Sequence, residues 1–185
     1  MEDSRIIDLF FAREEQAITE LMNAHGAAAA RVAGNILNNP QDAEECVSDA
    51  CLAAWNTIPP RRPDPLRTYL CKITRNLALK RYHANTAAKR GGGYALALEE
   101  LEEVLPARGN VEADYIVREL SSAVGTFLDT LDYDDRFMFV RRYWYADSVK
   151  DIAAMMHLGA HRVSVRLSRI RKRLQAYLKK EGLLA

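Results

Sequence analysis

The sequence of 185 residues lacks several features that would indicate particular classes of protein. It has only three cysteines, Cys46, Cys51 and Cys71, and no CxxC pair. We therefore expect no disulfide framework, and we interpret the cysteines as small buried apolar residues in a reducing cytoplasm. No apolar run reaches the ~18 residues of a membrane span. The opening MEDSRII has acids where a signal peptide would need cations, so we expect a soluble, cytoplasmic protein.

No segment alternates apolar and polar residues with period two, so β-strands are not expected. The six prolines fall between segments of helical pattern. The predicted fold class is all-α, with two small helical domains, at 1–85 and 112–185, joined by a flexible acidic linker at 86–111. The second domain is expected to contain a helix-turn-helix. The predicted helices cover residues 4–24, 26–37, 40–57 and 66–84 in the first domain, and 112–130, 133–145, 148–156 and 161–180 in the second.

The net charge of +1 conceals a strong segregation of charge along the chain. Between residues 61 and 90 there are nine lysines and arginines and a single acid, Asp64. Between residues 99 and 119 there are seven acids and two arginines, and between 162 and 180 eight cations and no acid. Two basic blocks separated by an acidic one predict two surfaces that bind a polyanion.

The last basic block belongs to the predicted helix-turn-helix, with a turn at Leu158 and Gly159 where glycine tolerates a positive φ. In the second helix an apolar stripe recurs at helical spacing and is flanked by arginines. This pattern favours a helix that docks on its own domain and offers cations to duplex DNA. The alternative is a solvated basic face on an ordinary helical hairpin. The candidate DNA-binding residues are His161, Arg162, Ser164, Val165, Arg166, Ser168, Arg169, Arg171, Lys172 and Arg173.

The predicted helix at 66–84, with the loop before it, combines cations, tyrosines and an asparagine. That combination suits single-stranded or melted nucleic acid, because bases stack on aromatic rings. For Tyr69 and Tyr82 taken singly, a place in the core is the better expectation. The candidate residues for this surface are Arg61, Arg62, Arg67, Tyr69, Lys72, Arg75, Asn76, Lys80 and Arg81.

The predicted helix at 40–57 has an acidic stripe formed by Asp42, Glu45 and Asp49. Paired carboxylates could perform acid–base chemistry, but nothing in the sequence would desolvate them or supply a nucleophile or a metal. We therefore expect a solvated face or a protein-docking face, and no catalytic residues.

Two further patterns are weak. His157 and His161 are four residues apart, as metal ligands on a helix would be, but Gly159 lies between them in the expected turn. Gly91, Gly92 and Gly93 lack the strand and the Lys-Ser/Thr of a phosphate-binding loop, so a hinge is the better interpretation. No metal and no cofactor are expected.

With these residues in view, nearly the whole chain resembles bacterial RNA polymerase sigma factors of the extracytoplasmic-function (ECF) type. The pattern DAEE…A.....W from Asp42 to Trp55 is similar to the core-polymerase-binding helix of that family. The segment LRTYLCKITRNLA from Leu66 to Ala78 resembles its promoter-melting helix. The pattern DIA..M.L....V..RLSR.R..L from Asp151 to Leu174 is similar to its C-terminal helix-turn-helix.

The resemblance implies a non-enzymatic, monomeric subunit that directs core RNA polymerase to promoter DNA. Asp42, Glu45, Ser48 and Asp49 would then bind the polymerase, the 66–84 helix would bind the melted promoter element, and the last helix would bind the upstream duplex element. A cognate anti-sigma factor is a possible further partner. The rival hypothesis is a two-domain helix-turn-helix transcription regulator that does not depend on core polymerase.

Overall fold

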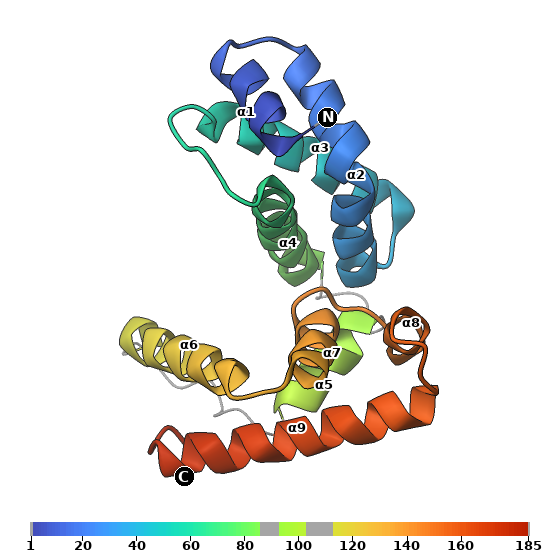
Figure 1. Ribbon diagram of the computed structural model, residues 1–185, viewed down its shortest axis with the longest axis vertical. Coiled ribbons are helices and arrows are strands. Elements are labelled where there is room, and N and C mark those ends of the chain that lie inside the picture. Colours follow the sequence, from blue (N-terminus) through green and yellow to red (C-terminus); the bar gives the residue numbers. More distant parts are fainter. Residues whose placement is uncertain (1, 86–92, 103–112, 185) are drawn as a thin grey trace. The chain divides into compact units, whose positions relative to one another are not determined.

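The computed structural model describes residues 2–85, 93–102 and 113–184, and every regular element in those residues is a helix (Figure 1). The all-α prediction is therefore confirmed. The chain divides into two compact units, which we call unit 1 (Met1–Tyr94) and unit 2 (Ala95–Ala185).

Unit 1 consists mainly of α1 (Asp3–Phe11), α2 (Gln16–Leu37), α3 (Pro40–Thr57) and α4 (Leu66–Asn85). Helix α2 packs against the other three helices, and α3 also packs against α4. The largest fully buried side chains of this unit are Ile6, Phe10, Leu21, Ile36, Ile58, Leu66 and Leu70.

The break between the first two helices lies well before residue 25, where the sequence predicts it. Helix α1 ends at Phe11, and Arg13 has a left-handed backbone with φ of 58°. The Arg13 guanidinium donates to the carbonyl oxygen of Trp55 at 2.7 Å and lies 5.3 Å from the Trp55 ring centroid. This contact with α3 accompanies the break, whereas Gly26 continues helically inside α2 because packing overrides its low helix propensity.

Helix α3 begins as its sequence predicts. The Asn39 side chain accepts from the backbone N–H groups of Gln41 and Asp42, and Pro40 occupies the first turn, where its missing N–H is not needed. The buried face of α3 includes Cys46 and Cys51, and Cys71 lies buried on α4. None of the three forms a disulfide, and burial raises the pKa of Cys46 to about 11. The interpretation of the cysteines as small buried residues is confirmed.

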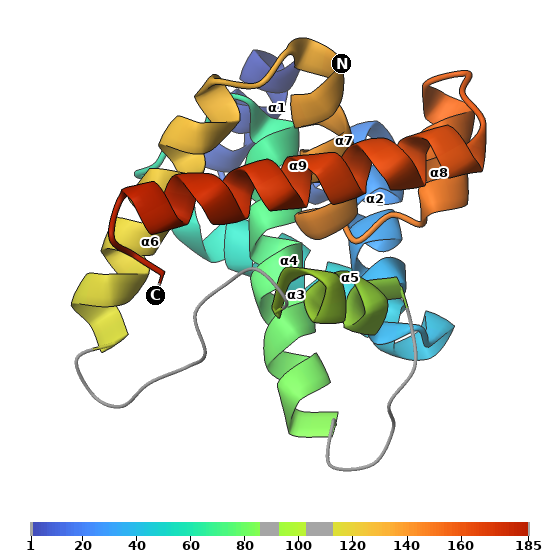
Figure 2. The ribbon, with the colours of Figure 1, turned by 90° about the horizontal axis from the view of Figure 1, so that it is seen from below.

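Unit 2 contains α6 (Ala113–Asp129), α7 (Tyr133–Tyr143), α8 (Val149–Met155) and α9 (Ala160–Lys180). Helices α6, α7 and α8 each pack against α9 (Figure 2). The Asp132 side chain caps α7 by accepting from the N–H of Asp135, and the Ser148 side chain caps α8 by accepting from the N–H of Asp151.

The structure differs from the expected linker at one place. Residues 93–102 form helix α5 (Gly93–Glu102), and unit 2 begins within it, at Ala95. Ala97 and Leu101 pack into the core of unit 2. The other residues of the expected linker, 86–92 and 103–111, lie outside the described residues, and so do Gly91 and Gly92 of the glycine triplet.

Candidate nucleic-acid interface

Helix α9 is held in place by the apolar stripe that the sequence predicts. Val163, Leu167, Ile170, Leu174 and Leu178 are all buried in the core of unit 2. At the C-terminal end, the ring of Tyr177 lies 5.7 Å from the ring of Phe127 on α6, measured between centroids. The opposite side of α9 is therefore turned outward.

The turn before α9 uses a different residue from the one expected. His157, not Gly159, has the left-handed conformation, with φ of 54°, whereas Gly159 has φ of −74° and precedes α9. The N–H of Leu158 donates to the carbonyl of Ala153 at 2.9 Å, and Leu158 packs against the core of unit 2. This is the arrangement in which a left-handed residue closes a helix and a following apolar residue anchors it.

Six of the predicted DNA-binding residues are exposed on α9, and we call this set the open face: His161, Arg162, Ser164, Arg169, Lys172 and Arg173. Val165 and Ser168 are half-buried beside them. No ion pair joins Arg162, Arg169 or Lys172 to another residue that the structure describes. Three cations on one turned-out side of a helix suit contact with the phosphates and base edges of a duplex.

Arg166 is engaged inside unit 2. Its Nη2 lies 2.7 Å from Oδ1 of Asp135, and Asp132 and Asp134 approach the same guanidinium at 3.6 Å and 3.5 Å. Arg173 also reaches Asp135, at 3.6 Å. The three aspartates belong to the start of α7, where the helix dipole favours carboxylates. Arg166 thus joins α7 to α9, while Arg173 remains half-exposed.

Arg171 is engaged on the other flank of α9, in a cluster around Glu100 of α5. The Glu100 carboxylate accepts from Nη2 and Nε of Arg142 at 2.7 Å and 3.3 Å, and from Nη1 of Arg171 at 3.1 Å. The Tyr143 hydroxyl donates to Glu100 at 2.9 Å and accepts from Arg171 at 2.8 Å.

This cluster is largely withdrawn from solvent. Arg142 is 3% exposed, and its Nη1 donates to the carbonyl oxygen of Asp147 at 3.0 Å. Burial alone would raise the pKa of Glu100, but hydrogen bonds from Arg142 and Tyr143 and the charges of Arg142 and Arg171 outweigh it, so the pKa lies below its ordinary value. Burial raises the pKa of the Tyr143 phenol. The carboxylate is therefore charged and the phenol protonated at neutral pH.

In unit 1, the candidate surface for melted DNA lies on the outward side of α4. Arg67, Lys72, Asn76 and Lys80 are exposed, whereas Arg75 is half-buried. Tyr69 is half-buried, and its hydroxyl donates to Oγ1 of Thr57 at 2.8 Å.

Two of the arginines proposed for that surface also make intramolecular ion pairs. Arg81 turns to α3, where its Nη2 lies 2.5 Å from Oε2 of Glu45 and its Nη1 donates to the carbonyl oxygen of Asp42 at 3.0 Å. Arg62 pairs with Asp8 at 2.9 Å and lies 4.3 Å from the ring centroid of Phe11. Arg61, next to it, is exposed. The acidic stripe of α3 and the basic face of α4 are thus joined at Arg81.

The outward side of α3 includes one residue that the sequence reasoning missed. Ser48 and Asp49 are exposed, and Ser48 donates to the carbonyl of Glu44 at 3.1 Å. Leu52 lies one turn further along and is 57% exposed. With polar residues around it, an exposed leucine has the composition needed for the centre of a protein-docking surface. Leu52 follows Ser48 by four residues, and this helical spacing could have predicted that both lie on the same side of α3.

Residues 21–87 match the model of the protein family described as Sigma-70 region 2. The matched segment begins inside α2 and includes all of α3 and α4, and therefore both candidate surfaces of unit 1. None of the curated proteins matches the chain.

Several solved structures match the chain, and one of them is similar over almost its full length. It is described as the structure of CnrH in complex with the cytosolic domain of CnrY. The sequence identity is 24%, the TM-score is 0.45, and the similarity covers 96% of this chain and 97% of that chain. A similarity of this degree is too distant to assign a function or a partner.

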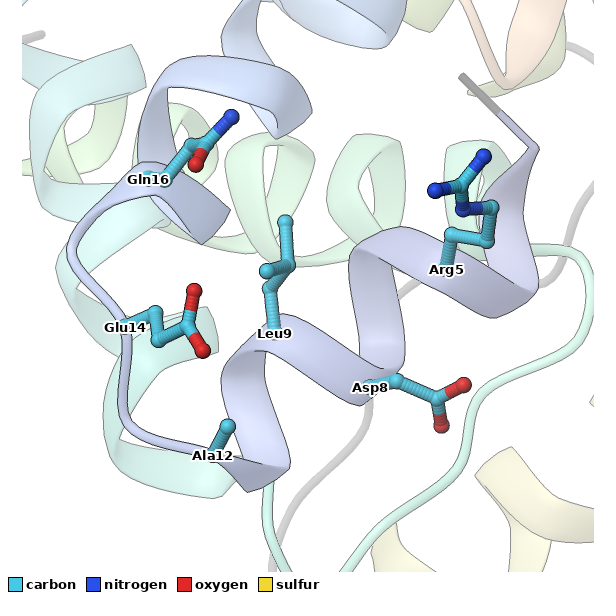
Figure 3. A pocket seen from close by; sticks show the side chains of 6 residues that line it. All are labelled: Arg5, Asp8, Leu9, Ala12, Glu14 and Gln16. Carbon is cyan, nitrogen blue, oxygen red and sulfur yellow. The ribbon is translucent and has the colours of Figure 1, made fainter.

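The other features of the residues that the structure describes indicate no small-molecule site. A hollow formed by α1, the turn after it and the start of α2, shown in Figure 3, is lined by Arg5, Asp8, Leu9, Ala12, Glu14 and Gln16. It mixes charges of both signs and has no convergent set of polar groups. Among the described side chains, no cluster of His, Cys, Asp and Glu could hold a metal ion. Within the same residues, no helix has the length and apolar character needed to cross a membrane.

Proposed function

We propose that the chain is a promoter-specificity subunit, a sigma factor of ECF type, that directs core RNA polymerase to a dedicated set of promoters in the cytoplasm. The observation that carries this proposal is the match of residues 21–87 to Sigma-70 region 2. The presence of outward cationic faces on α4 in unit 1 and on α9 in unit 2 supports it. In this role the chain performs no chemistry, because the polymerase does.

The docking surface for core polymerase is the outward side of α3. Leu52 supplies an apolar centre, and Ser48 and Asp49 supply a polar rim. Such a centre with a polar surround is the usual anatomy of a protein interface. Asp42 and Glu45 act there mainly through their contacts with Arg81, which hold α3 against α4.

The surface for the melted promoter strand is the outward side of α4. Arg67, Lys72 and Lys80 neutralise backbone phosphates, and the Asn76 amide offers a donor and an acceptor to an unstacked base. Arg61, in the loop before α4, extends the same positive charge. A base that has left the stack can be recognised by its edge, which links melting to sequence preference.

The surface for the upstream duplex element is the open face of α9. Arg162, Ser164, Val165 and Ser168 belong to the first half of the helix, which is the part that reaches base edges in helix-turn-helix proteins. Arg169, Lys172 and Arg173 follow them and contact phosphates. A bidentate arginine–guanine contact by Arg162 would discriminate bases by ~1–3 kcal/mol.

Run-off transcription with core polymerase on a library of random promoters tests the proposal. We expect transcripts that depend on the chain and that start downstream of a shared two-part sequence. Replacement of Leu52 by Glu should abolish them, whereas replacement of the half-buried Glu20 by Gln, far from all three surfaces in sequence, should not.

A second experiment separates the rival hypothesis from the proposal. A regulator that acts without core polymerase would bind duplex DNA but would form no complex with the core enzyme in a pull-down at micromolar concentration. That result would overturn the proposed function. A cognate anti-sigma factor is expected only on the resemblance described above.

A further inference from the structure

The donors around Glu100 form a site for an oxyanion. The N–H groups of a guanidinium bind phosphate in the same paired geometry as carboxylate. Here the guanidinium of Arg142 holds Glu100 through two nitrogens, and Arg171 and Tyr143 complete the set. Because Arg142 is 3% exposed, its charge requires an anion beside it. The carboxylate of the chain itself occupies the site.

The site borders the open face of α9. Arg171 follows Ile170 of the buried stripe and precedes the exposed Lys172. It therefore stands at the edge between the docked side and the outward side of the helix. Lys172 and Arg171 are adjacent on α9. A DNA backbone that contacts Lys172 therefore lies close to Arg171, and its phosphate can bind there once Glu100 has left the site.

Helix α5 is weakly anchored on unit 2 apart from this cluster. Its apolar contacts with the core of the unit are those of Ala97 and Leu101, whereas Leu96 is 57% exposed. Tyr94, at the start of α5, is buried but packs edge-on against Tyr82 of α4, with ring centroids 5.1 Å apart. Burial of one alanine and part of one leucine removes little apolar surface from water. A helix of ten residues is also marginal by itself. The hydrogen bonds and ion pairs of Glu100 are consequently the main polar attachment of α5 to unit 2.

We propose that Arg142, Tyr143 and Arg171 form a phosphate-binding site for duplex DNA, and that Glu100 occupies this site in the free chain and leaves when DNA binds. The proposal rests on the proposed role of unit 2 in binding duplex DNA. Glu100 and a backbone phosphate then compete for the same donors. The apparent affinity for DNA is then the intrinsic affinity multiplied by the fraction of molecules in which α5 is not docked.

A charge-matched pair of variants tests the competition in the full chain. Glu100→Gln removes the carboxylate from the site, and Glu99→Gln makes the same change of charge at the adjacent, exposed position of α5. The measurement is the dissociation constant for a short fluorescent duplex of mixed sequence, at one low salt concentration. We expect Glu100→Gln to bind about fivefold more tightly or better, the lower end of typical coupling between sites, and Glu99→Gln to change by less than about twofold.

A third variant identifies the donor. In the double variant Glu100→Gln/Arg171→Gln the gain in affinity should disappear, since the guanidinium that DNA acquires is gone. Equal affinities for Glu100→Gln and Glu99→Gln, or a gain that survives the loss of Arg171, would overturn this inference and leave the proposed function standing. No duplex binding by any variant, including the unmodified chain, would overturn both.

A second measurement needs no variant and covers the case in which Glu100→Gln does not fold. Amide hydrogen exchange in residues 95–102 of the unmodified chain reports whether α5 is docked. Addition of the same duplex should accelerate that exchange, because α5 leaves the site. Unchanged or slower exchange at saturating duplex would contradict the displacement of Glu100.

Discussion

At the scale of single residues, the cations of α9 divide according to the carboxylates within reach. Arg166 is held by aspartates of α7, and Arg171 is held by Glu100 of α5. Arg162, Arg169 and Lys172 are exposed on the open face. Neighbours in one basic run therefore have different partners, and substitutions of them should have different effects.

Lys172→Gln and Arg166→Gln form a pair that tests this division. Removal of Lys172 should weaken duplex binding for all sequences and reduce the slope of log affinity against log salt by about 1, as expected for one lost phosphate contact. Removal of Arg166 should leave that slope unchanged and instead destabilise unit 2 by roughly 1–3 kcal/mol, because aspartates lose their hydrogen-bonded partner. Fluorescence anisotropy over a salt series and urea unfolding measure the two effects, and a reduced slope for Arg166→Gln would contradict the assignment.

The Glu100 cluster predicts a pH dependence of stability. The folded pKa of Glu100 lies below its ordinary value, so its stabilising effect is fully present above about pH 4.5 and is lost as the pH falls through the depressed folded pKa. Glu100→Gln should therefore lower the free energy of unfolding at pH 7, and this difference from the unmodified chain should shrink in acid. Urea unfolding at a series of pH values measures it. If the difference in unfolding free energy stays constant down to about pH 3, the carboxylate charge of Glu100 is not involved.

At the scale of elements, α2 shows that packing sets helix limits more strongly than glycine content. The helix continues through Gly26 and Gly34 and ends at Asn38, which has a left-handed backbone with φ of 51°. A Cβ at Gly26 would lie 3.1 Å from Cε of Met22, whereas a Cβ at Gly34 would meet nothing within 4 Å. The two positions in one helix therefore differ in what a side chain would encounter.

Gly34→Ala should stabilise unit 1 by ~0.5–1 kcal/mol, because alanine favours the helix and restricts the unfolded chain. Gly182→Ala is the control, since Gly182 has a φ of +73° that alanine adopts only with strain. It should give no gain. Thermal unfolding followed by circular dichroism compares the variants, and a destabilised Gly34→Ala would indicate that α2 needs the glycine for a contact not yet identified.

At the scale of the whole molecule, the proposed tasks belong to different compact units. The surface proposed for core polymerase lies on α3 in unit 1, and the open face, proposed for duplex DNA, lies on α9 in unit 2. A substitution of a residue that contacts only its own unit should therefore affect either polymerase binding or duplex binding, but not both.

The double variant Asp49→Lys/Leu52→Glu should lose binding to core polymerase by at least about tenfold, which is the effect of losing ~1.4 kcal/mol at the interface centre. Its affinity for duplex DNA in the absence of polymerase should equal that of the unmodified chain. The reciprocal variant, Arg169→Gln/Lys172→Gln, should bind core polymerase normally and DNA weakly. Loss of both activities in either variant would show that the two surfaces are not independent.

Much of the fold follows from local pattern. The limits of α3, α4, α7, α8 and α9 agree with the predicted helices to within two residues, because caps such as Asn39 and Ser148 and apolar stripes act over one or two turns. The break near residue 13 was missed because it coincides with the contact of Arg13 with Trp55, which is distant in sequence. The left-handed residue of the turn was wrongly assigned to Gly159, since the anchoring of Leu158 in the core favours His157.

The sequence by itself determined the helical class, the buried stripe of α9 and the concentration of cations on α4 and α9, since each depends on spacing and charge along a few turns. Only the tertiary structure decided which of those cations already have partners. Arg81 meets Glu45, Arg166 meets Asp135, and Arg171 meets Glu100 across separations of 36, 31 and 71 residues. An ion pair depends on distance in space, and periodicity does not reveal which distant carboxylate the packed core brings within reach of an arginine.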